Sequence, residues 1–308
     1  MSNHSKASHG VEFGELARAT EGLTQWRPML VGFGSLLLCG VLMGISGAAM
    51  AALGNFFGVV LAGLLGLLAL VVMFGGFSAV GIMLMDKARN LPARSLTDAM
   101  TLGVLCIPRF LLFVLMLAVL TLAVGLVATL LYLLCKIPFL GALLAFFVHP
   151  ALVLLTAFLM VAVSFVAIPL FAPAVWSGLS FRQAMTSLIA IARKRLVQVV
   201  LMLIVLYLVV MVVAGLLMLG LVPATALMSS MAAGILSPSS FFNVFGMLMN
   251  TGMSFMMGRF DLGGGALAGA MAGMAVLMMV VGALIAQVWI MGFTLMFLQA
   301  ANGIDLSE

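Results

Sequence analysis

Long apolar tracts separated by short basic clusters dominate the pattern of this chain. Residues 29–85, for example, contain no charged side chain. Apolar runs longer than about 18 residues are typical of membrane spans, because roughly 20 helical residues cross a hydrocarbon core about 30 Å thick. Within lipid the backbone must satisfy its own hydrogen bonds, as it does in a helix. The pattern therefore predicts an all-α integral membrane protein.

The lengths of the apolar tracts predict six transmembrane helices. Residues 29–85 are long enough for two spans, with a turn at Leu53, Gly54 and Asn55. A third span is predicted at 110–134. The remaining spans are predicted at about 148–170, at 196–221 with an end near Pro223, and at about 265–297. Residues 222–264, which are rich in Met, Ser and Gly, are expected to form an external segment before the last span.

The distribution of Lys and Arg predicts the orientation of these spans. The N-terminal region, the 86–109 loop and the 180–195 segment hold 3, 4 and 4 basic residues, whereas the opposite side holds only Lys136 and Arg259. Cytoplasmic loops carry an excess of basic residues. We therefore expect a multi-pass protein of a bacterial inner membrane with both termini in the cytoplasm.

Two of the basic segments share a short sequence pattern, which indicates an internal repeat. Residues 95–101 (SLTDAMT) align with 180–186 (SFRQAMT), and a basic residue follows the shared alanine ten positions later in both. A weaker third copy begins near the N-terminus, so Ala17, Ala99 and Ala184 are expected at equivalent positions. We interpret the chain as one membrane domain, 1–308, with pseudo-repeats at 1–85, 86–171 and 172–308. Each unit is expected to be a short interfacial helix followed by a transmembrane hairpin.

The short helices have predicted caps and two distinct faces. Ser180 and Gln183 have the spacing of a capping box, and Ser95 with Asp98 forms a weaker version. After Ser180, the apolar face is predicted at Phe181, Met185, Leu188 and Ala192, and the polar face at Arg182, Gln183, Thr186, Arg193 and Lys194. Such a helix lies in the headgroup plane, or it acts as an elbow that turns the chain into the next span; the two interpretations are compatible. The residues expected to meet lipid headgroups are Arg27, Lys87, Arg89, Arg94, Arg109, Arg182, Arg193, Lys194 and Arg195.

The composition argues against catalysis and against charge-coupled transport. Hydrophobic residues make up 66% of the chain and charged residues 7%, whereas about a quarter of the residues in soluble domains are charged. No Asp, Glu, Lys or Arg falls inside the six predicted spans, where ion-coupled transporters place functional groups. No HExxH, Walker or GxSxG motif is present, so we expect neither enzyme activity nor a cofactor. The net charge of +5 comes from residues beside the spans and does not indicate nucleic-acid binding.

One histidine and a group of methionines remain as candidate ligands. His149 precedes Pro150, which we expect to break an incoming helix, so the histidine is interpreted as a polar residue at a helix start. Thioethers suit Cu(I), and five methionines crowd into the external segment. These speculative Cu(I) ligands are Met247, Met249, Met253, Met256 and Met257. Methionine is equally common inside the spans, where it fills gaps in the packing.

Glycines at four-residue spacing mark a face on the first and on the sixth predicted span. Small residues let helix backbones approach closely in lipid, where no hydrophobic effect drives association. The glycines expected to pack in this way are Gly40, Gly44, Gly265, Gly269 and Gly273. They serve either packing within this protein or contact with another copy or a partner protein.

The layout resembles the YciC-like group of uncharacterised bacterial inner-membrane proteins, and the membrane domain fused to some glycerophosphodiester phosphodiesterases. The resemblance rests on the S-x-x-x-A-M-T segments at 95–101 and 180–186, each followed by a basic position and a long span, and on Pro169 and Pro173 before the second segment. It implies a six-helix inner-membrane bundle and supplies no catalytic residues. The phosphodiesterase activity does not carry over, because the sequence contains no such domain.

These features favour a non-catalytic accessory or scaffold subunit that associates with other membrane proteins, with further copies of itself, or with lipids of the bilayer. The alternative is a transporter or permease for a small, weakly polar solute. Its scarce polar lining would be Gln198, Gln287, Asn250 and His149.

Overall fold

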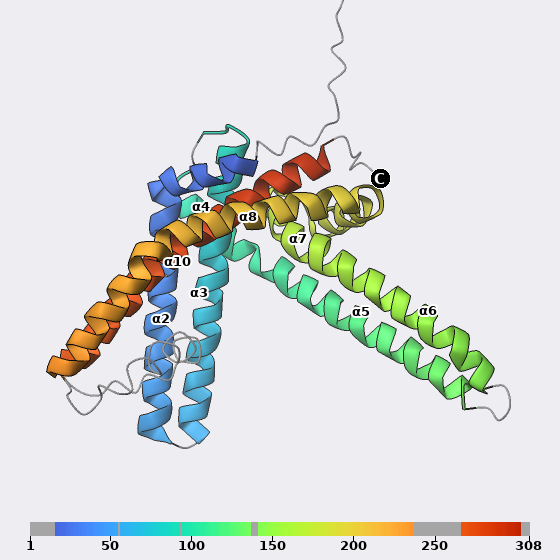
Figure 1. The fold of residues 1–308 in the computed structure, drawn as a ribbon, viewed down its shortest axis with the longest axis horizontal. Helices are drawn as coiled ribbons and strands as arrows, with labels where there is room; N and C mark the ends of the chain where they lie inside the picture. Colours follow the sequence, from blue (N-terminus) through green and yellow to red (C-terminus); the bar gives the residue numbers. More distant parts are fainter. Residues whose placement is uncertain (1–15, 55, 93, 137–140, 237–265, 303–308) are drawn as a thin grey trace, which may run out of the picture. The chain divides into compact units, whose positions relative to one another are not determined.

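The structure, a computed structural model, describes residues 16–54, 56–92, 94–136, 141–236 and 266–302 (Figure 1). Every regular element in this part of the chain is a helix, and the described residues contain no strand. Six stretches are long and apolar enough to cross a membrane. They are Trp26–Leu53, Phe56–Ala88, Leu96–Leu134, Leu144–Trp176, Phe181–Met228 and Ala272–Ala301. The prediction of an all-α chain with six helices of membrane-spanning length is confirmed for the described residues.

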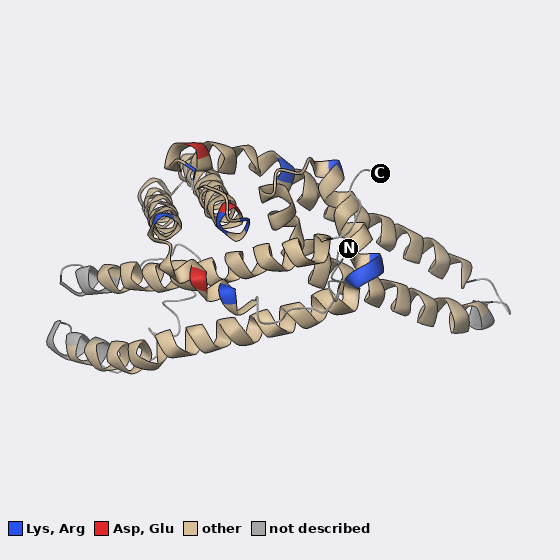
Figure 2. Ribbon diagram, turned by 90° about the horizontal axis from the view of Figure 1, so that it is seen from above, with Lys and Arg blue, Asp and Glu red and all other residues tan. Residues whose placement is uncertain are grey.

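The chain folds into two compact units, each described here by itself. The first, which we call the α2–α4 unit, comprises Gly14–Leu105 and Leu206–Gly292. The second, the α5–α7 unit, includes Cys106–Val205 and the chain from Phe293 onward. Two long helices, α8 (Phe181–Leu236) and α10 (Ala266–Ala301), contribute to both units. Charged residues are scarce along the ribbon, as the composition requires (Figure 2).

An antiparallel hairpin of α2 (Trp26–Leu53) and α3 (Phe56–Ala88) forms the frame of the α2–α4 unit (Figure 1). The predicted turn is confirmed: α2 ends at Leu53, and Gly54 has a φ of +53°, a left-handed conformation that glycine adopts without steric cost. Across the hairpin, the Ser46 hydroxyl donates to the carbonyl of Ala62 at 3.0 Å. The short η1 (Ala17–Thr24), a 3-10 helix, precedes α2.

The short helix α4 (Leu96–Leu105) packs against α3 in the same unit. The contact depends on Gly103, where an added Cβ would overlap the carbonyl oxygen of Gly75 and lie 2.8 Å from the amide nitrogen of Ala79. Only a residue without a side chain permits this approach of two backbones. Helix α3 therefore has α2 on one flank and α4 on another.

In the α5–α7 unit, α5 (Ile107–Leu134) is followed by α6 (Gly141–Ala162), a short π-helical stretch η2 (Val163–Ala167) and α7 (Ile168–Trp176). The predicted helix break at Pro150 is wrong, because α6 runs through His149 and Pro150. A proline removes one backbone donor, and in a helix surrounded by lipid no alternative structure would satisfy the remaining groups better. The helix therefore continues, and residues 141–147, which precede the span predicted at about 148–170, belong to it.

The predicted end of the fifth span near Pro223 is also wrong. Helix α8 continues through Pro223 to Leu236, so the beginning of the predicted external segment 222–264 is helical. The one departure from helical geometry in α8 is Arg195, with φ −135° and ψ 22°. This break separates the short amphipathic stretch from the long apolar one. The last predicted span, 265–297, agrees with α10 to within a few residues.

Candidate functional site

The start of α8 forms the capping box that the sequence predicts. The amide of Gln183 donates to the Ser180 hydroxyl at 3.4 Å, and the amide of Ser180 donates to Gln183 Oε1 at 3.0 Å. At α4 the box is half complete, as expected: the Asp98 amide donates to the Ser95 hydroxyl at 3.1 Å, and the hydroxyl donates to the Asp98 carboxylate. Both caps satisfy backbone donors that have no partner inside the helix.

The first three turns of α8 have one exposed and one buried face. All five residues predicted for the polar face are exposed, which confirms that face. The buried stripe is centred on Ala184, Leu188 and Ile191, which are 0%, 2% and 0% exposed. Phe181 and Met185, predicted on the apolar face, lie at its edge and are half-buried. This stretch of α8 is therefore held by packing on one side only.

Ala99 and Ala184, the alanines of the two matched segments, are both fully buried. Ala17, assigned to the same position in the weaker third copy, is exposed, and the buried alanine of η1 is Ala19. The register proposed for the first copy is not followed, because η1 has 3-10 geometry and turns a different residue inward.

Arg195 and Arg94, both expected at lipid headgroups, have polar partners within the protein. Arg195 Nη1 donates to the carbonyl oxygens of Gln299 and Ala300 at 3.1 and 3.2 Å, at the C-terminal end of α10. Arg94 Nε lies 2.8 Å from Oδ2 of the buried Asp86, an ion pair without the alignment of a hydrogen bond. Sequence reasoning missed both contacts, although the unpaired carbonyls at a helix C-terminus are a known attraction for cations.

The other basic residues lie mainly on the surface. Arg109, at the start of α5, is half-buried. The exposed ones are Arg27, Lys87, Arg89, Arg182, Arg193 and Lys194.

The residues named as a possible solute path do not gather at one place in the described chain. Gln287 is buried in α10, and with its amide suitably oriented the nitrogen donates to the carbonyl of Gly22 at 2.8 Å, while the oxygen accepts from the amide of Met29 at 2.5 Å. Gln198 is half-buried in α8. Asn250 lies outside the described residues. The amide of Gln287 thus ties η1 and α2 to α10 within the α2–α4 unit.

His149 has a polar partner on the neighbouring helix. Its Nδ1 lies 2.8 Å from the hydroxyl of Tyr132 in α5, and the two exposed side chains share a hydrogen bond. A shallow hollow of about 450 Å³ beside them is lined by Ala145, Phe146, Phe147, His149 and Pro150. The lining is aromatic and apolar apart from His149, so this place joins α5 to α6 rather than offering a set of polar ligands.

The close helix contacts in the structure involve glycines other than those predicted to pack. A Cβ at Gly44 or Gly273 would meet no atom within 4 Å, and Gly265 lies outside the described residues. Close approach occurs instead at Gly76, where a Cβ would overlap the Ser35 side chain, and at Gly103. The search for glycines at four-residue spacing could not reveal these positions, because Gly76 has valines four residues away on both sides and Gly103 is paired at that spacing with Ala99 rather than with a second glycine.

No group of three or more His, Cys, Asp or Glu side chains suited to a metal ion occurs within the described ranges. The five methionines proposed for Cu(I) lie in 237–265, outside the part of the chain that the structure describes. Chemistry at that segment stays a prediction from the sequence.

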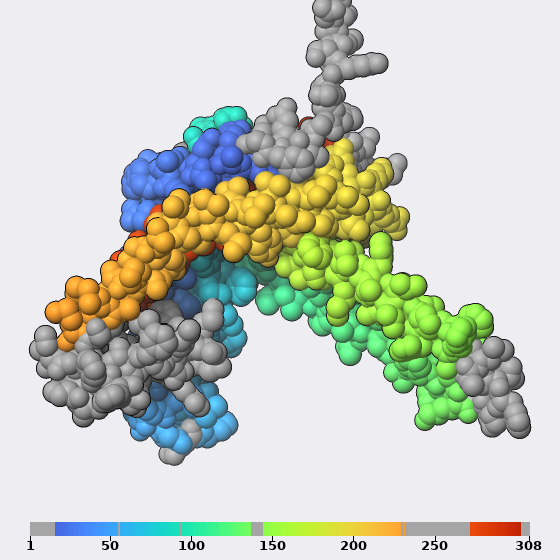
Figure 3. Space-filling view, in the orientation of Figure 1, coloured from blue at the N-terminus to red at the C-terminus, as the bar shows by residue number. Residues whose placement is uncertain are grey.

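A broad apolar surface distinguishes the α5–α7 unit. Of all the residues in α5, only Phe113 is buried. Phe113 stacks on Phe171 of α7 with a centroid distance of 4.0 Å and an angle of 9°, and this contact fixes the start of α5. Beyond it, large apolar side chains on both α5 and α6 are exposed along the hairpin (Figure 3). Most of the surface of this hairpin is therefore open to lipid or to another protein.

No family model, no curated protein and no solved structure matches this chain.

Proposed function

We propose that this protein is a non-catalytic accessory or scaffold subunit of a bacterial inner membrane, which packs against other membrane proteins or lipids. The observation that carries the proposal is the exposure of α5, of which Phe113 alone is buried. A helix with one buried residue gains little from packing within its own chain. Its surface is suited to contact with something else in the bilayer.

The chemistry of this surface fits association rather than transport. In lipid, helices associate through close packing and interhelical hydrogen bonds. Gly125, in the middle of α5, is exposed and has open space around it, so a neighbouring helix can approach the backbone there. The alternative of a permease has weaker support, because Gln287, one of its four proposed polar residues, uses its amide to bond Gly22 and Met29.

The proposed arrangement in the membrane follows from the basic residues. Both termini, the 86–109 loop and the 180–195 segment are assigned to the cytoplasm by the excess of Lys and Arg. The start of α8 and helix α4 rest on the headgroups as repeated elbows, supported by their similar caps and by the burial of Ala99 and Ala184. The resemblance to the YciC-like group belongs to the same proposal.

Native purification tests the function directly. The protein would be extracted in a mild detergent from its own membrane and analysed by native mass spectrometry and light scattering. We expect a co-purifying membrane protein, a second copy or retained lipid, and we expect Gly125→Leu to weaken a protein contact made through α5. A monodisperse monomer with no bound protein or lipid would contradict the proposal.

A further inference from the structure

A groove of about 390 Å³ runs along the α2–α4 unit. Helix α3 contacts both α2 and α4, so its residues form the floor, and the other two helices form the walls. Two adjacent glycines, Gly75 and Gly76, lie on the floor, and Gly34 lies on the α2 wall. At Gly34 a Cβ would meet no atom within 4 Å, so this glycine leaves part of the groove open.

The lining of the groove is suited to hydrocarbon. Along α4, Leu96, Met100 and Val104 follow one another at four-residue spacing, which places them on one face of the helix. The one polar side chain in the lining, Ser35, already donates its hydroxyl to the carbonyl of Val31 at 2.7 Å. No other side chain in the lining carries a polar atom that could bind a polar ligand. An apolar chain is therefore better matched to this groove than water or a polar solute.

The size of the groove suits a narrow ligand. From Leu30 to Leu38, the wall formed by α2 extends over roughly 12 Å at about 1.5 Å per helical residue. One leaflet of the hydrocarbon core is about 15 Å thick, half of the roughly 30 Å total. A transmembrane helix has a diameter of about 10 Å or more and needs far more space than this groove offers. An acyl chain fits both its length and its volume of about 390 Å³.

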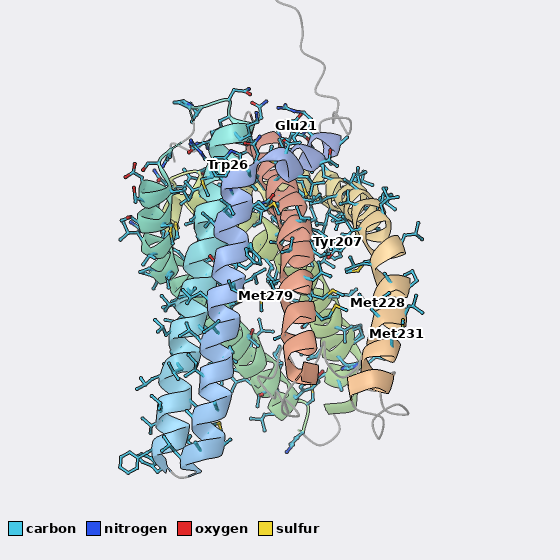
Figure 4. The ribbon with its side chains drawn as sticks, turned by 90° about the vertical axis from the view of Figure 1, so that its left-hand side faces the viewer. Glu21, Trp26, Tyr207, Met228, Met231 and Met279 are labelled. Atoms are coloured by element: carbon cyan, nitrogen blue, oxygen red, sulfur yellow. The ribbon has the colours of Figure 1, made fainter. Side chains whose placement is uncertain are left out.

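The positively charged side chain of Arg27 lies on the same face of α2, one turn from the groove. Arg27 precedes Leu30 and Val31 by three and four positions, the spacing that puts residues on one helix face. It is exposed and forms no ion pair with any residue that the structure describes. Its guanidinium lies 5.5 Å from the ring centre of Trp26, which is 61% exposed at this end of α2 (Figure 4). Exposed tryptophan and arginine at a helix end are typical of the level of the headgroups.

From these observations we infer that the groove seats one acyl chain of an anionic phospholipid whose phosphate pairs with Arg27. The guanidinium suits phosphate because its donors match two oxygens at once. This inference deepens the proposed association with lipids and rests on it. It commits to a lipid of the surrounding bilayer, held at one defined place, rather than to a protein partner.

Filling the groove tests the acyl-chain seat. The full-length protein would be reconstituted in nanodiscs that contain equal parts of phosphatidylglycerol and phosphatidylcholine, and the lipid retained after release would be counted by native mass spectrometry. Gly34→Leu places a side chain into the groove, and because a Cβ there meets no atom within 4 Å we expect the fold to be retained. Gly63→Leu is the matched control, because Gly63 is an exposed glycine of the same hairpin, also with open space, and does not line the groove.

We expect the wild type and Gly63→Leu to retain one phosphatidylglycerol, and Gly34→Leu to lose it by about tenfold. Equal retention in Gly34→Leu and the wild type overturns the acyl-chain seat, as does an equal loss in both variants. Loss of a dimer in Gly34→Leu, with lipid unchanged, would show that a second copy occupies the groove and would also overturn it.

Removal of the cation tests the headgroup. We expect Arg27→Gln to reduce the preference for phosphatidylglycerol over phosphatidylcholine at least fivefold, while Lys136→Gln, which removes an equal charge from an exposed position just after α5, leaves it unchanged. An unchanged preference in Arg27→Gln overturns the assignment of the phosphate. These results are independent of native partners: a protein without partners in its own membrane contradicts the scaffold proposal but still shows the Gly34→Leu effect if the seat exists.

Discussion

At the scale of single residues, the packing of the helices depends on glycines, which have no side chain. A Cβ at Gly76 would overlap both Oγ and Cβ of Ser35, so α2 and α3 are closer there than any other residue would allow. Ser35 contributes by turning its hydroxyl back to the carbonyl of Val31, which leaves no polar atom unpaired at the contact. In lipid, where the hydrophobic effect between helices is missing, such close packing is a main source of stability.

Gly76→Ala should therefore separate the two helices. We expect a loss of about 1–3 kcal/mol, typical of overpacking, visible as a lower melting temperature in detergent. The matched control is Gly66→Ala in the same helix, where a Cβ meets no atom within 4 Å and the change is expected to be neutral or slightly stabilising. The double variant Gly76→Ala with Ser35→Gly should recover most of the loss, because it removes the overlapping atoms. Equal melting of the two single variants would contradict this account.

At the scale of elements, one side chain, that of Arg195, connects the break in α8 to the C-terminal end of α10. Arg195 leaves helical geometry, and its guanidinium donates to the carbonyls of Gln299 and Ala300, near the last residue of α10. The final carbonyls of a helix have no partner inside it, and they carry the negative end of its dipole. A cation at this point satisfies both, so the residue that interrupts α8 also caps α10.

We expect Arg195→Met to destabilise the α5–α7 unit by about 1–2 kcal/mol, toward the lower end for hydrogen bonds to charged groups because Arg195 is only half-buried. Hydrogen exchange should accelerate at the last turn of α10, where the cap is lost. Arg193→Met removes an equal charge from an exposed position and should leave both stability and exchange unchanged. If the two variants exchange at the same rate in that turn, the cap has no energetic role.

The stack of Phe113 on Phe171 anchors α5 to α7, and two further rings surround Phe171 edge-on. Phe110 and Phe181 lie with centroids 5.7 and 6.0 Å from it. Phe171→Leu keeps an apolar side chain but removes these ring contacts, which are worth about 0.5–1.5 kcal/mol each. We expect a loss of that order or more in a thermal or denaturant titration. Phe147→Leu, at a residue that is 64% exposed, should change little, and a comparable loss there would refute the assignment.

How far the sequence predicts these elements depends on what controls each boundary. The turn at Gly54 was predictable because a left-handed residue is required there, and the capping box at Ser180 because its hydrogen bonds are local. Pro150 and Pro223 misled the prediction, since inside lipid a broken helix would leave more backbone groups unpaired than the proline itself does. The contacts of Gly76 and Arg195 were not predictable, because spacing along a chain does not say which neighbour faces it.

At the scale of the whole molecule, the six apolar stretches and the basic clusters predict one arrangement of the chain across the membrane, and it can be tested. If the N-terminus is cytoplasmic, the turn at Gly54 is external, and the segment around Asn90 returns to the cytoplasm after α3. The ion pair of the buried Asp86 with the exposed Arg94 near the end of α3 fits this return, because it leaves no unpaired carboxylate in the apolar part.

Reporter fusions decide the arrangement. Alkaline phosphatase depends on disulfides, which form in the periplasm and not in the cytoplasm. A fusion after Gly54 should therefore be active, and one after Asn90, separated from it by α3 alone, should be inactive. A fusion after Lys136 should be active, whereas a fluorescent protein after Glu308 should fluoresce in the cytoplasm. Phosphatase activity at Asn90, or none at Gly54, would reverse the orientation and would place the basic elbows and the groove beside Arg27 on the external side.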